Sequence, residues 1–352
     1  MVGRQDWVVC AREAQATLLL AERIMRARKV FATLSLAVVV AAVADIGGAP
    51  SQGAPTLRFA VIGSAGQTEV PFAIQQASLD KKYGINIEII DFAAPGQQYN
   101  MFRSGAADIA GGNFIDLLRQ RKGGNAIQAI HGFQGHSNVF VVKPNSSARE
   151  FADLKGKKVG TFGTTFLDWL IARAAGKKAH NIDLQTDATL VPGAPPLLNQ
   201  FLARGEVDAT LQFSSLTLAP IARNEQRILI DLPALMKAAG FRSDSFYLQW
   251  MITEKWAKAN PEAVTKLPAM LNEAYAVLNR DDGLWPALAQ RINVTDPAIT
   301  TAYRDLERRV DNPPYSAELI KPTQELLNAI IAIAGEQAVG VTTLDPAAFL
   351  FP

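Results

Sequence analysis

Hydrophobic and polar positions repeat the same order of elements twice along residues 56–250. Each copy opens with an apolar run that ends in glycine, at 57–63 and again at 157–163. In both copies there follow a polar loop, a stretch with apolar residues at helical spacing, a second apolar run and a second helical stretch. Because the two copies lie about one hundred residues apart, we predict two α/β units built on one plan.

Each copy ends with a helical stretch, a glycine, and a strand that begins after an aspartate. These segments are 102–109 and 201–209. Gly105 and Gly205 are predicted C-caps, because glycine readily takes the left-handed conformation that ends a helix. Strands that alternate with helices are typical of parallel sheets, in which ligands bind beyond the carboxyl ends of the strands. We therefore expect a cleft where the two sheets present these edges to each other, with helix N-termini facing it.

Two further strand-like runs, 138–142 and 246–252, are predicted to carry the chain from one unit to the other and back. Two crossings of this kind make a hinge. The expected lobes are lobe 1 at 56–138 together with 246–352, and lobe 2 at 139–245. Three helical patterns beyond the second crossing are expected to pack on lobe 1: 261–278, 283–292 and 321–334.

The chain begins with a segment that is typical of export signals. Residues 25–29 hold three basic side chains, and residues 30–43 form a charge-free apolar run. We predict a signal peptide at 1–44, cleaved after Ala44, with Met25 as an alternative translation start, and a flexible linker at 45–55. A membrane anchor is the alternative, but the apolar run is shorter than the roughly 20 residues that span a bilayer.

Charge and cysteine content narrow the classes of function. The formal charge is +2, but the first 44 residues hold six basic and three acidic side chains, and the rest holds 29 basic and 30 acidic. A nearly neutral chain lacks the basic surface that nucleic acid binding needs, so nucleic acid is not expected as a partner. The single cysteine, Cys10, precedes the apolar run, so the exported chain has no disulfide, thiolate metal ligand or cysteine nucleophile.

Signals for catalysis are missing as well. The three histidines, His131, His136 and His180, have no further ligand at metal-binding spacing. The chain contains no Gly-x-Ser-x-Gly nucleophile motif, and its glycine-containing loop at 63–66 fits neither a Walker loop nor a dinucleotide fingerprint. We expect no catalytic residue, no metal and no cofactor, and therefore no enzyme.

Candidate ligand contacts lie in the loops that follow the predicted strands and next to the two crossings. Small and hydroxyl residues in these loops allow the main chain and side chains to form hydrogen bonds with a ligand, and aromatic residues offer apolar surface. The candidates are Ser64, Gly66, Gln67, Thr68, Asn113 and Phe114 in lobe 1, Thr164, Thr165, Phe166, Gln212, Phe213 and Ser214 in lobe 2, and His136, Tyr247 and Trp250 beside the crossings.

Each candidate has a structural alternative. The hydroxyl residues can instead cap their helices, and the phenylalanines can belong to the core. Alternation along the strand puts Tyr247 and Trp250 on opposite faces, so one of the two is expected to face the ligand. Glu69 and Asp168 can pair with an amine, but each is in the predicted first turn of a helix, where an acid is favoured anyway. We assign these two acids to the helix starts.

The candidate loops contain no arginine or lysine, the usual partners of a carboxylate or sulfonate. Two interpretations remain open. Either helix-terminal amides hold an anion, or the ligand is neutral and largely apolar, for example an aromatic compound.

Four segments resemble the substrate-binding proteins of ABC importers for aliphatic sulfonates, taurine and nitrate, a family that extends to pyrimidine-precursor (NMT1/THI5-like) binders. The Asp-Leu-Lys-Gly-Lys-Lys-Val run at 153–159 is the most distinctive match, and the resemblance covers nearly all of 56–280. The chain departs at 211–215, where sulfonate binders often carry Trp-Asp-Pro. The four matching segments are 102–111, 151–160, 201–209 and 256–262.

The resemblance implies an α/β type II periplasmic-binding-protein fold, with two α/β lobes, a two-strand hinge and a ligand cleft between them. It implies a periplasmic monomer that binds a small organic anion of the sulfonate, nitrate or carboxylate type and delivers it to an ABC permease in the inner membrane. Two alternatives stay open: an extracytoplasmic sensing subunit of a signalling receptor, and a binder of a neutral aromatic or pyrimidine-like ligand.

Overall fold

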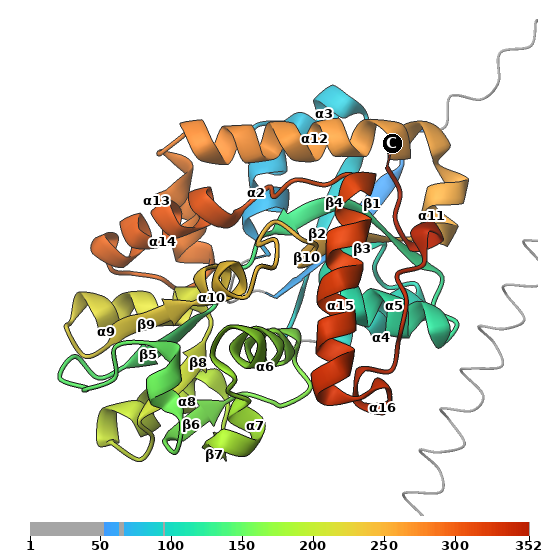
Figure 1. The fold of residues 1–352 in the computed structure, drawn as a ribbon. Coiled ribbons are helices and arrows are strands. Elements are labelled where there is room, and N and C mark those ends of the chain that lie inside the picture. Colours follow the sequence, from blue (N-terminus) through green and yellow to red (C-terminus); the bar gives the residue numbers. More distant parts are fainter. Residues whose placement is uncertain (1–52, 63–66, 94–95, 352) are drawn as a thin grey trace, which may run out of the picture. The chain divides into compact units, whose positions relative to one another are not determined.

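The chain folds around two five-stranded sheets (Figure 1). The computed structural model describes residues 53–62, 67–93 and 96–351. Both sheets belong to one unit, Gln52–Pro352. The predicted signal peptide at 1–44, the alternative start at Met25 and most of the linker at 45–55 lie outside the described residues. Among the residues described, no helix is long and apolar enough to cross a membrane.

The first sheet holds four strands from the first repeat and its flank, together with the returning strand. Its order is β2-β1-β3-β10-β4. β1 is parallel to β2 and β3, whereas β10 is antiparallel to β3 and β4. The strands are β1 (Thr56–Ile62), β2 (Asn86–Phe92), β3 (Ile109–Asn113), β4 (Ile127–Gln134) and β10 (Leu248–Thr253).

The second sheet repeats this arrangement in the order β7-β6-β8-β5-β9. Here β6 is parallel to β7 and β8, and the outgoing strand β5 is antiparallel to β8 and β9. The strands are β5 (Val139–Val142), β6 (Lys158–Thr161), β7 (Thr189–Pro192), β8 (Ala209–Gln212) and β9 (Arg227–Asp231). We call the first sheet with its helices lobe 1 and the second with its helices lobe 2.

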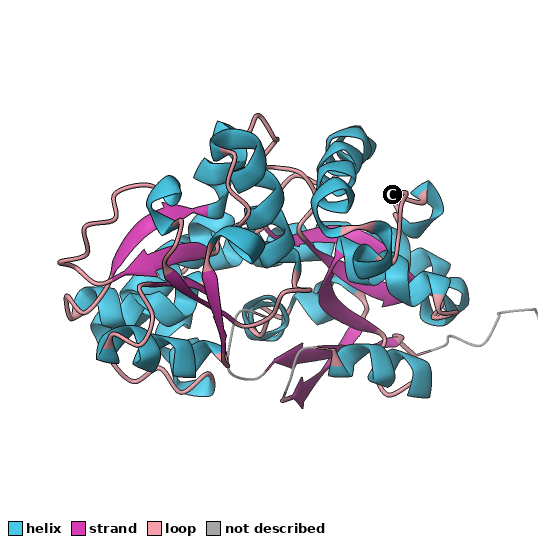
Figure 2. Ribbon diagram, turned by 60° about the horizontal axis from the view of Figure 1, so that its bottom comes forward, coloured by secondary structure: helices cyan, strands magenta, loops and turns pink. Residues whose placement is uncertain are grey.

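Helices flank the strands of both sheets (Figure 2). Lobe 1 contains α2 (Glu69–Gln76), α3 (Leu79–Tyr83), α4 (Gln97–Ser104), α5 (Phe114–Lys122), α11 (Glu254–Ala259), α12 (Pro261–Arg280), α13 (Leu284–Arg291), α14 (Pro297–Val310), α15 (Ile320–Ala334), α16 (Glu336–Val339) and the short η3 (Ala317–Leu319) and η4 (Pro346–Ala348). Lobe 2 contains α6 (Leu167–His180), α7 (Leu184–Asp187), α8 (Pro195–Arg204), α9 (Leu218–Ala222), α10 (Leu232–Ala238) and the short η1 (Phe151–Leu154) and η2 (Ser214–Thr217).

The internal repeat is visible in the register of the strands. Phe59 of β1 is opposite Ile109 of β3, and one hundred residues later Val159 of β6 is opposite Ala209 of β8. The helices before β3 and β8 end at Gly105 and Gly205 with φ of 72° and 77°, which confirms the two predicted C-caps.

Alternation along the first sheet separates two apolar clusters. Phe59, Ile109 and Trp250 lie on one face and pack against α2 and α12. Ala60, Ala110 and Met251 lie on the other face, in a cluster with residues of α5 and α15. Strand neighbours on opposite faces follow from the two-residue period of a β-strand.

Two helices of lobe 1 also contact lobe 2. α15 packs against α6, and Arg173 Nη2 of α6 donates to the Ile333 carbonyl at 2.9 Å (Figure 1). α14 contacts η2 and α9, and Leu218 of α9 joins the apolar cluster of lobe 1 that contains Tyr303. The predicted helical pattern at 321–334 therefore packs on both lobes. The helix α14 was not predicted.

The two chain crossings touch each other between the lobes. The outgoing segment precedes β5 and the returning segment precedes β10. Asn138 Nδ2 donates to the Tyr247 hydroxyl at 3.1 Å, and the His136 and Tyr247 rings are 4.5 Å apart. The predicted two-strand connection is thus present, and its two segments share buried polar contacts.

Candidate functional site

A cavity of about 260 Å³ lies where the carboxyl ends of β1, β3 and β8 approach each other. Such edges carry the ligand sites of open α/β sheets, because helix N-termini and loop main chain meet there. Lobe 1, lobe 2 and the returning crossing all contribute to the lining. The described lining residues are Ile62, Gln67, Gly96, Gln98, Tyr99, Gly111, Gly112, Asn113, Ile115, Asp116, Arg119, Thr165, Phe166, Leu167, Asp168, Phe213, Tyr247 and Leu248.

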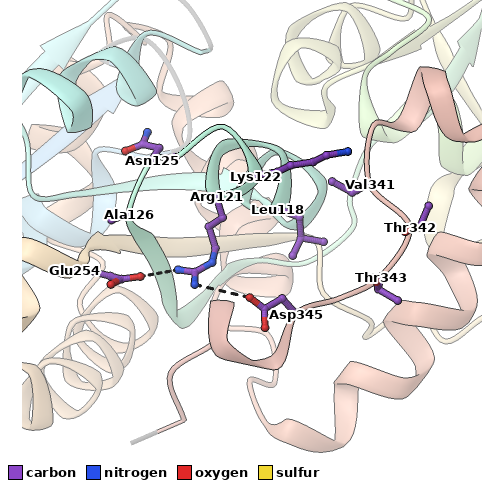
Figure 3. Close-up of a pocket in the computed structure, with 11 residues that line it drawn as sticks. Leu118, Arg121, Lys122, Asn125, Ala126, Glu254, Val341, Thr342, Thr343 and Asp345 are labelled. Carbon is purple, nitrogen blue, oxygen red and sulfur yellow. Dashed lines mark hydrogen bonds and ion pairs between the residues drawn. The ribbon is translucent and has the colours of Figure 1, made fainter.

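A larger cavity of about 510 Å³ lies on lobe 1 alone, between the end of α5, the start of α11 and the C-terminal segment (Figure 3). Its cations are already paired. Arg121 Nη1 donates to Glu254 at 2.8 Å, and Lys122 Nζ donates to the Gly340 carbonyl at 2.9 Å. Figure 3 shows the Arg121 side chain between Glu254 and Asp345. We take the smaller cavity as the candidate site, because both lobes line it and it contains unpartnered polar atoms.

Two buried polar atoms in the lobe 1 wall have no hydrogen-bond partner among the described residues. They are Gln67 Oε1 and the hydroxyl of Tyr99. A buried polar atom without a partner costs free energy, so such atoms mark places where water or a ligand binds. Burial also raises the pKa of Tyr99 well above its usual value, which keeps its hydroxyl protonated and able to donate.

Two consecutive glycines at the end of β3 allow the side chains of Gln67 and Tyr99 to lie close to the strand. A Cβ at Gly111 would lie 3.2 Å from Gln67 Nε2, and a Cβ at Gly112 would lie 2.8 Å from the Tyr99 hydroxyl oxygen. Gln98 supports the same wall, because its Nε2 donates to the Gly111 carbonyl at 3.3 Å and its Oε1 accepts from Gly96 N at 2.7 Å. A side chain at Gly112 would force its neighbours to move and one at Gly111 would be tight, so the two glycines allow the lobe 1 wall to pack closely on the strand.

The cation in the described lining is engaged elsewhere. Arg119 donates to Asp116 at 3.1 Å and to the carbonyls of Val339 and Ala338 at 2.7 and 3.1 Å. Asn113 caps α5 by accepting from Asp116 N at 2.9 Å, and its Nδ2 donates to the Asp116 carboxylate at 2.8 Å. The bonds of Arg119 connect α5 to α16. They occupy Nε, Nη1 and Nη2 of its guanidinium group, which is therefore not free to bind an anion through two parallel hydrogen bonds.

Asp168 is the acid of the lobe 2 wall. It is in the first turn of α6, only 5% exposed, and accepts from the Tyr247 hydroxyl at 2.6 Å. Burial raises the pKa of Asp168 to about 6, although its hydrogen bonds with Tyr247 and Asn138 act in the opposite direction. Burial also keeps the pKa of Tyr247 well above its usual value, so Tyr247 stays a donor.

His136 lies behind this pair and not in the cavity wall. Its Nε2 is 3.4 Å from Ser245 Oγ, and its ring packs on Tyr247. Burial lowers the pKa of His136 to about 3, so the imidazole is neutral at physiological pH. We assign it to the connection between the two crossings.

Aromatic rings complete the lobe 2 wall. Phe162 is in T-shaped contact with Phe166 at 5.2 Å and stacks on Phe213 at 4.6 Å, measured between ring centroids. Phe166 and Phe213 line the cavity, and Phe166 stays 40% exposed. An exposed phenylalanine on a cavity wall offers apolar contact to a ligand.

Six of the residues singled out from the sequence line this cavity: Gln67, Asn113, Thr165, Phe166, Phe213 and Tyr247. Of the two aromatic residues on the returning crossing, Tyr247 therefore faces the cavity, whereas Trp250 is fully buried and donates from Nε1 to the Tyr275 hydroxyl at 2.9 Å. Their role in holding a ligand stays a prediction.

The structure places the other described candidates away from the lining. Phe114 is fully buried in the lobe 1 core, Gln212 Nε2 donates to Pro195 and Asn199, and Ser214 donates to the Ser137 carbonyl. Ser64 and Gly66 lie outside the described residues. The remaining candidates that are not in the lining are Thr68, Thr164 and His136.

Several lining residues were not proposed from the sequence. Gln98 and Tyr99 follow the sequence pair Pro95-Gly96, which matches Pro192-Gly193 in the second repeat. Two sequence features could have pointed to these residues: the Pro-Gly pair before them, and the Gly111-Gly112 pair inside a strand. Glycine in a strand marks the close approach of another chain segment. Asp168 was recognised and assigned to its helix start, which is also correct for its position in α6.

Metal chemistry finds no support in the described part of the chain, which contains no group of three or more histidine, cysteine, aspartate or glutamate side chains arranged to hold an ion. The lining of the candidate site consists of hydrogen-bonding, apolar and aromatic side chains, which can hold a small organic molecule.

Several solved structures share this fold. The alkanesulfonate-binding protein from Xanthomonas axonopodis pv. citri bound to MOPS is 21% identical, with a TM-score of 0.62 over 85% of this chain and 99% of that chain. The periplasmic aliphatic sulphonate binding protein from Escherichia coli is 19% identical, with a TM-score of 0.69 over 84% and 92%. A desulfurization enzyme is 16% identical, with a TM-score of 0.54 over 81% and 96%.

These similarities confirm the predicted two-lobed α/β fold of the periplasmic-binding-protein type. No curated protein matches the chain. The model of the family described as NMT1/THI5 like matches residues 81–281, which is more than half of the sequence and includes strands of both sheets. The chain therefore belongs to the NMT1/THI5-like family.

Proposed function

We propose that this chain is a periplasmic solute-binding protein, which captures a small molecule between its lobes and delivers it to an ABC permease in the inner membrane. The observation that carries the proposal is the cavity between the strand ends of the two lobes, in which the buried Gln67 Oε1 and Tyr99 hydroxyl lack partners. A ligand that hydrogen-bonds to both atoms removes the cost of leaving them unpaired.

The similar structures support this proposal. Two of them are named as binding proteins for alkanesulfonates or aliphatic sulphonates, and one of these is named as periplasmic. A desulfurization enzyme also shares the fold. The described cavity lining of this chain contains no cysteine, serine or histidine and therefore no Ser-His or Cys-His pair for nucleophilic catalysis, which favours binding without chemistry.

Closure of the two lobes is the mechanism we propose for capture. The ligand first meets the lobe 1 wall of Gln67, Gln98 and Tyr99, and the lobe 2 wall of Phe166 and Phe213 then covers it. The two crossings absorb the rotation, as in other hinge proteins. A permease recognises the closed form, in which both lobes present a fixed surface.

A small organic anion, the ligand type that the resemblance implies, has limited support in the geometry. Arg119 is engaged by Asp116 and two carbonyls, and Asp168 adds negative charge on the opposite wall. An anion can still bind the N-terminal amides of α6, whose residues Leu167 and Asp168 line the cavity. An anion at these amides lies beside the Asp168 carboxyl group. Its binding therefore requires a protonated Asp168, because two neighbouring negative charges repel each other.

Thermal unfolding with candidate ligands tests the proposal. The protein, expressed from the full sequence and purified, is heated with sulfonates, nitrate, carboxylates, amines, neutral aromatic compounds and pyrimidines. A ligand at one hundred times its dissociation constant is expected to stabilise the folded state by about 2.7 kcal/mol. Stabilisation by none of these classes, together with scattering profiles that do not change, would contradict a solute-binding role.

A matched pair of variants places the ligand in the cleft. Phe166→Ala removes an exposed ring from the cavity wall and is expected to weaken binding by roughly tenfold. Leu197→Ala removes a side chain of lobe 2 that is exposed to the same degree, 38% compared with 40%, but does not line the cavity. Equal affinities of the two variants in calorimetric titration would argue against the cleft as the binding site.

A further inference from the structure

The charges of the cavity wall are not balanced within the described residues. The charged lining residues are Asp116, Arg119 and Asp168. Arg119 is paired with Asp116 at 3.1 Å. Asp168, on the opposite wall, forms no ion pair with a lysine or arginine in the part of the chain that the structure describes. A carboxyl group that is 95% buried normally has a charged partner, which makes this acid an unexplained feature of the site.

The hydrogen-bonding atoms around Asp168 favour donors on the ligand. Gln67 Oε1 is an acceptor without a partner, and the Tyr99 hydroxyl can both accept and donate. The Tyr247 hydroxyl is occupied because it donates to Asp168 at 2.6 Å and accepts from Asn138 at 3.1 Å. The lining thus offers two unpartnered oxygen atoms and a carboxyl group, and its one guanidinium is already bound.

We propose that the cleft selects a small ligand with a basic, hydrogen-bond-donating nitrogen, and that Asp168 is its charge partner. This inference rests on the proposed solute-binding function and specifies the ligand of the same site. The nitrogen supplies the positive charge that Asp168 lacks. A second donor on the ligand reaches Gln67 Oε1 on the opposite wall.

The cost of the buried acid explains why the ligand must carry this nitrogen. Holding an ionised carboxylate in a cavity without a cation is unfavourable, whereas closure around a cation gives a desolvated, charge-assisted hydrogen bond. Phe166 and Phe213 line the same cavity and can add a favourable contact between the cation and an aromatic face. A volume of about 260 Å³ limits the ligand to a small molecule.

The same geometry predicts how binding changes with pH. Burial raises the pKa of Asp168 to about 6. The groups around it are Tyr247 and Asn138 of the crossings, the paired Asp116 and Arg119 of α5, and His136 behind Tyr247, whose pKa is lowered to about 3 by burial. Burial keeps the pKa of His136 far below this range and that of Tyr247 well above it, so neither of them changes charge between pH 5 and pH 8. A cationic ligand therefore binds more tightly as pH rises through about 6, and an anionic ligand binds less tightly.

Matched probes on two carbon skeletons test the inference. Benzylamine, benzyl alcohol and benzenesulfonate form one set, and butylamine, butanol and butanesulfonate form the other. Thermal shift and calorimetric titration at pH 5 and pH 8 compare the wild type with Asp168→Asn. Glu325→Gln is the control, because Glu325 is an exposed acid on α15 away from the cavity.

The amines are expected to stabilise the wild type and the Glu325→Gln control more than the matched alcohols and sulfonates do. Their affinity is expected to rise at least roughly fivefold from pH 5 to pH 8, and to fall roughly tenfold in Asp168→Asn. The wild-type pH profile keeps the test decisive even if Asp168→Asn does not fold.

Sulfonates that bind better than the amines, with affinity that falls as pH rises, would overturn this inference and leave the proposed function intact. Amines that bind with no dependence on pH or on Asp168 would also overturn it. Lack of stabilisation by all six probes would overturn the inference, and lack of stabilisation by the full ligand panel would overturn the proposed function itself.

Discussion

At the scale of single residues, the candidate site depends on how closely side chains approach the end of β3. Gly111 and Gly112 carry no side chain, so Gln67 and Tyr99 lie directly over the strand. Both residues line the cavity, and each carries a buried oxygen atom without a hydrogen-bond partner among the described residues. Strand glycines are costly for folding, which suggests that this pair is present for the site.

Gly112→Ala is expected to disturb the site at this point. The new Cβ would lie 2.8 Å from both the Tyr99 hydroxyl oxygen and Met251 Cε, so both side chains or the strand itself must move. We expect the free energy of unfolding to fall by about 1–3 kcal/mol and ligand affinity to fall with it. Gly53→Ala is the control, because a Cβ there has no neighbour within 4 Å. Urea unfolding that does not distinguish the two variants would contradict this packing.

The sequence could predict which residues line the cavity where their position in a loop after a strand was sufficient. Gln67, Thr165, Phe166 and Phe213 follow strands and line the cavity. Asp168 was harder, because an acid in a first helical turn has a sufficient local reason to be there. Only the fold shows that Tyr247, 79 residues later, donates to it inside the cleft.

At the scale of elements, the repeat was readable because each copy uses the same local contacts. Asp108 accepts from Arg58 N at 3.1 Å, and Asp208 accepts from Lys158 N at 2.8 Å. Each of these acids fixes the start of the strand that follows its C-cap glycine. The sequence motif is therefore structural, and it positions the strand ends that form the site.

The two aspartates give a comparison within one chain. Asp108 is buried and also forms two side-chain hydrogen bonds of 2.7 Å with Arg58, whereas Asp208 is exposed. We expect Asp108→Ala to lower the free energy of unfolding by about 3 kcal/mol and Asp208→Ala by about 1 kcal/mol. Chemical denaturation measures both values. Equal losses would show that the Arg58 contact adds nothing.

Beyond the repeat, the sequence could predict the helices that carry many apolar residues along one face. α12, α13 and α15 lie within two residues of the patterns at 261–278, 283–292 and 321–334. α14 was missed, although Asp296 caps it and Pro297 begins it. Its buried residues are Tyr303, Leu306 and Glu307, so only two apolar side chains mark its buried face although they stand at helical spacing.

Packing between α15 and α6 connects the lobes and can be tested separately from the hinge. Ile330 of α15 is fully buried in the cluster that contains Leu170 and Ile171 of α6. Ile330→Ala is expected to lower the free energy of unfolding by about 2–5 kcal/mol. Ile331→Ala, on the half-buried side of the same helix, is the control and is expected to cost less. Equal losses of unfolding free energy in the two variants would show that the face of α15 that contacts α6 does not stabilise the fold more than the half-buried side does.

At the scale of the whole molecule, helix contacts besides the crossings join the lobes within the described residues. α15 packs on α6 on one side, and α14 packs on η2 and α9 on the other. The sequence could predict two lobes and two crossings, because these follow from the repeat and the apolar runs. It could not predict these bridges, since they join segments of unrelated sequence that only the folded arrangement brings together.

The buried acids of α14 make the stability of the whole molecule depend on pH. Glu307 is 2% exposed and accepts from Gln134 Nε2 at 3.0 Å, while Tyr303 donates to Glu69 in the same region. Burial, assisted by the charge of Glu69, raises the pKa of Glu307 to about 8. The pKa of Asp311 is raised well above its usual value by burial and by Glu307 and Glu69.

Because folded Glu307 keeps its proton up to about pH 8 and the unfolded chain releases it near pH 4.5, stability is lost as pH rises from about 4.5 towards 8. Between pH 6.5 and pH 8.5 we expect the melting temperature of the wild type to fall by roughly 5 °C more than that of Glu307→Gln, in which Asp168 is unchanged. The glutamine keeps the contact with Gln134 and cannot ionise. Calorimetry at both pH values measures the difference, and parallel melting curves of the two proteins would mean that Glu307 is already ionised in the folded state.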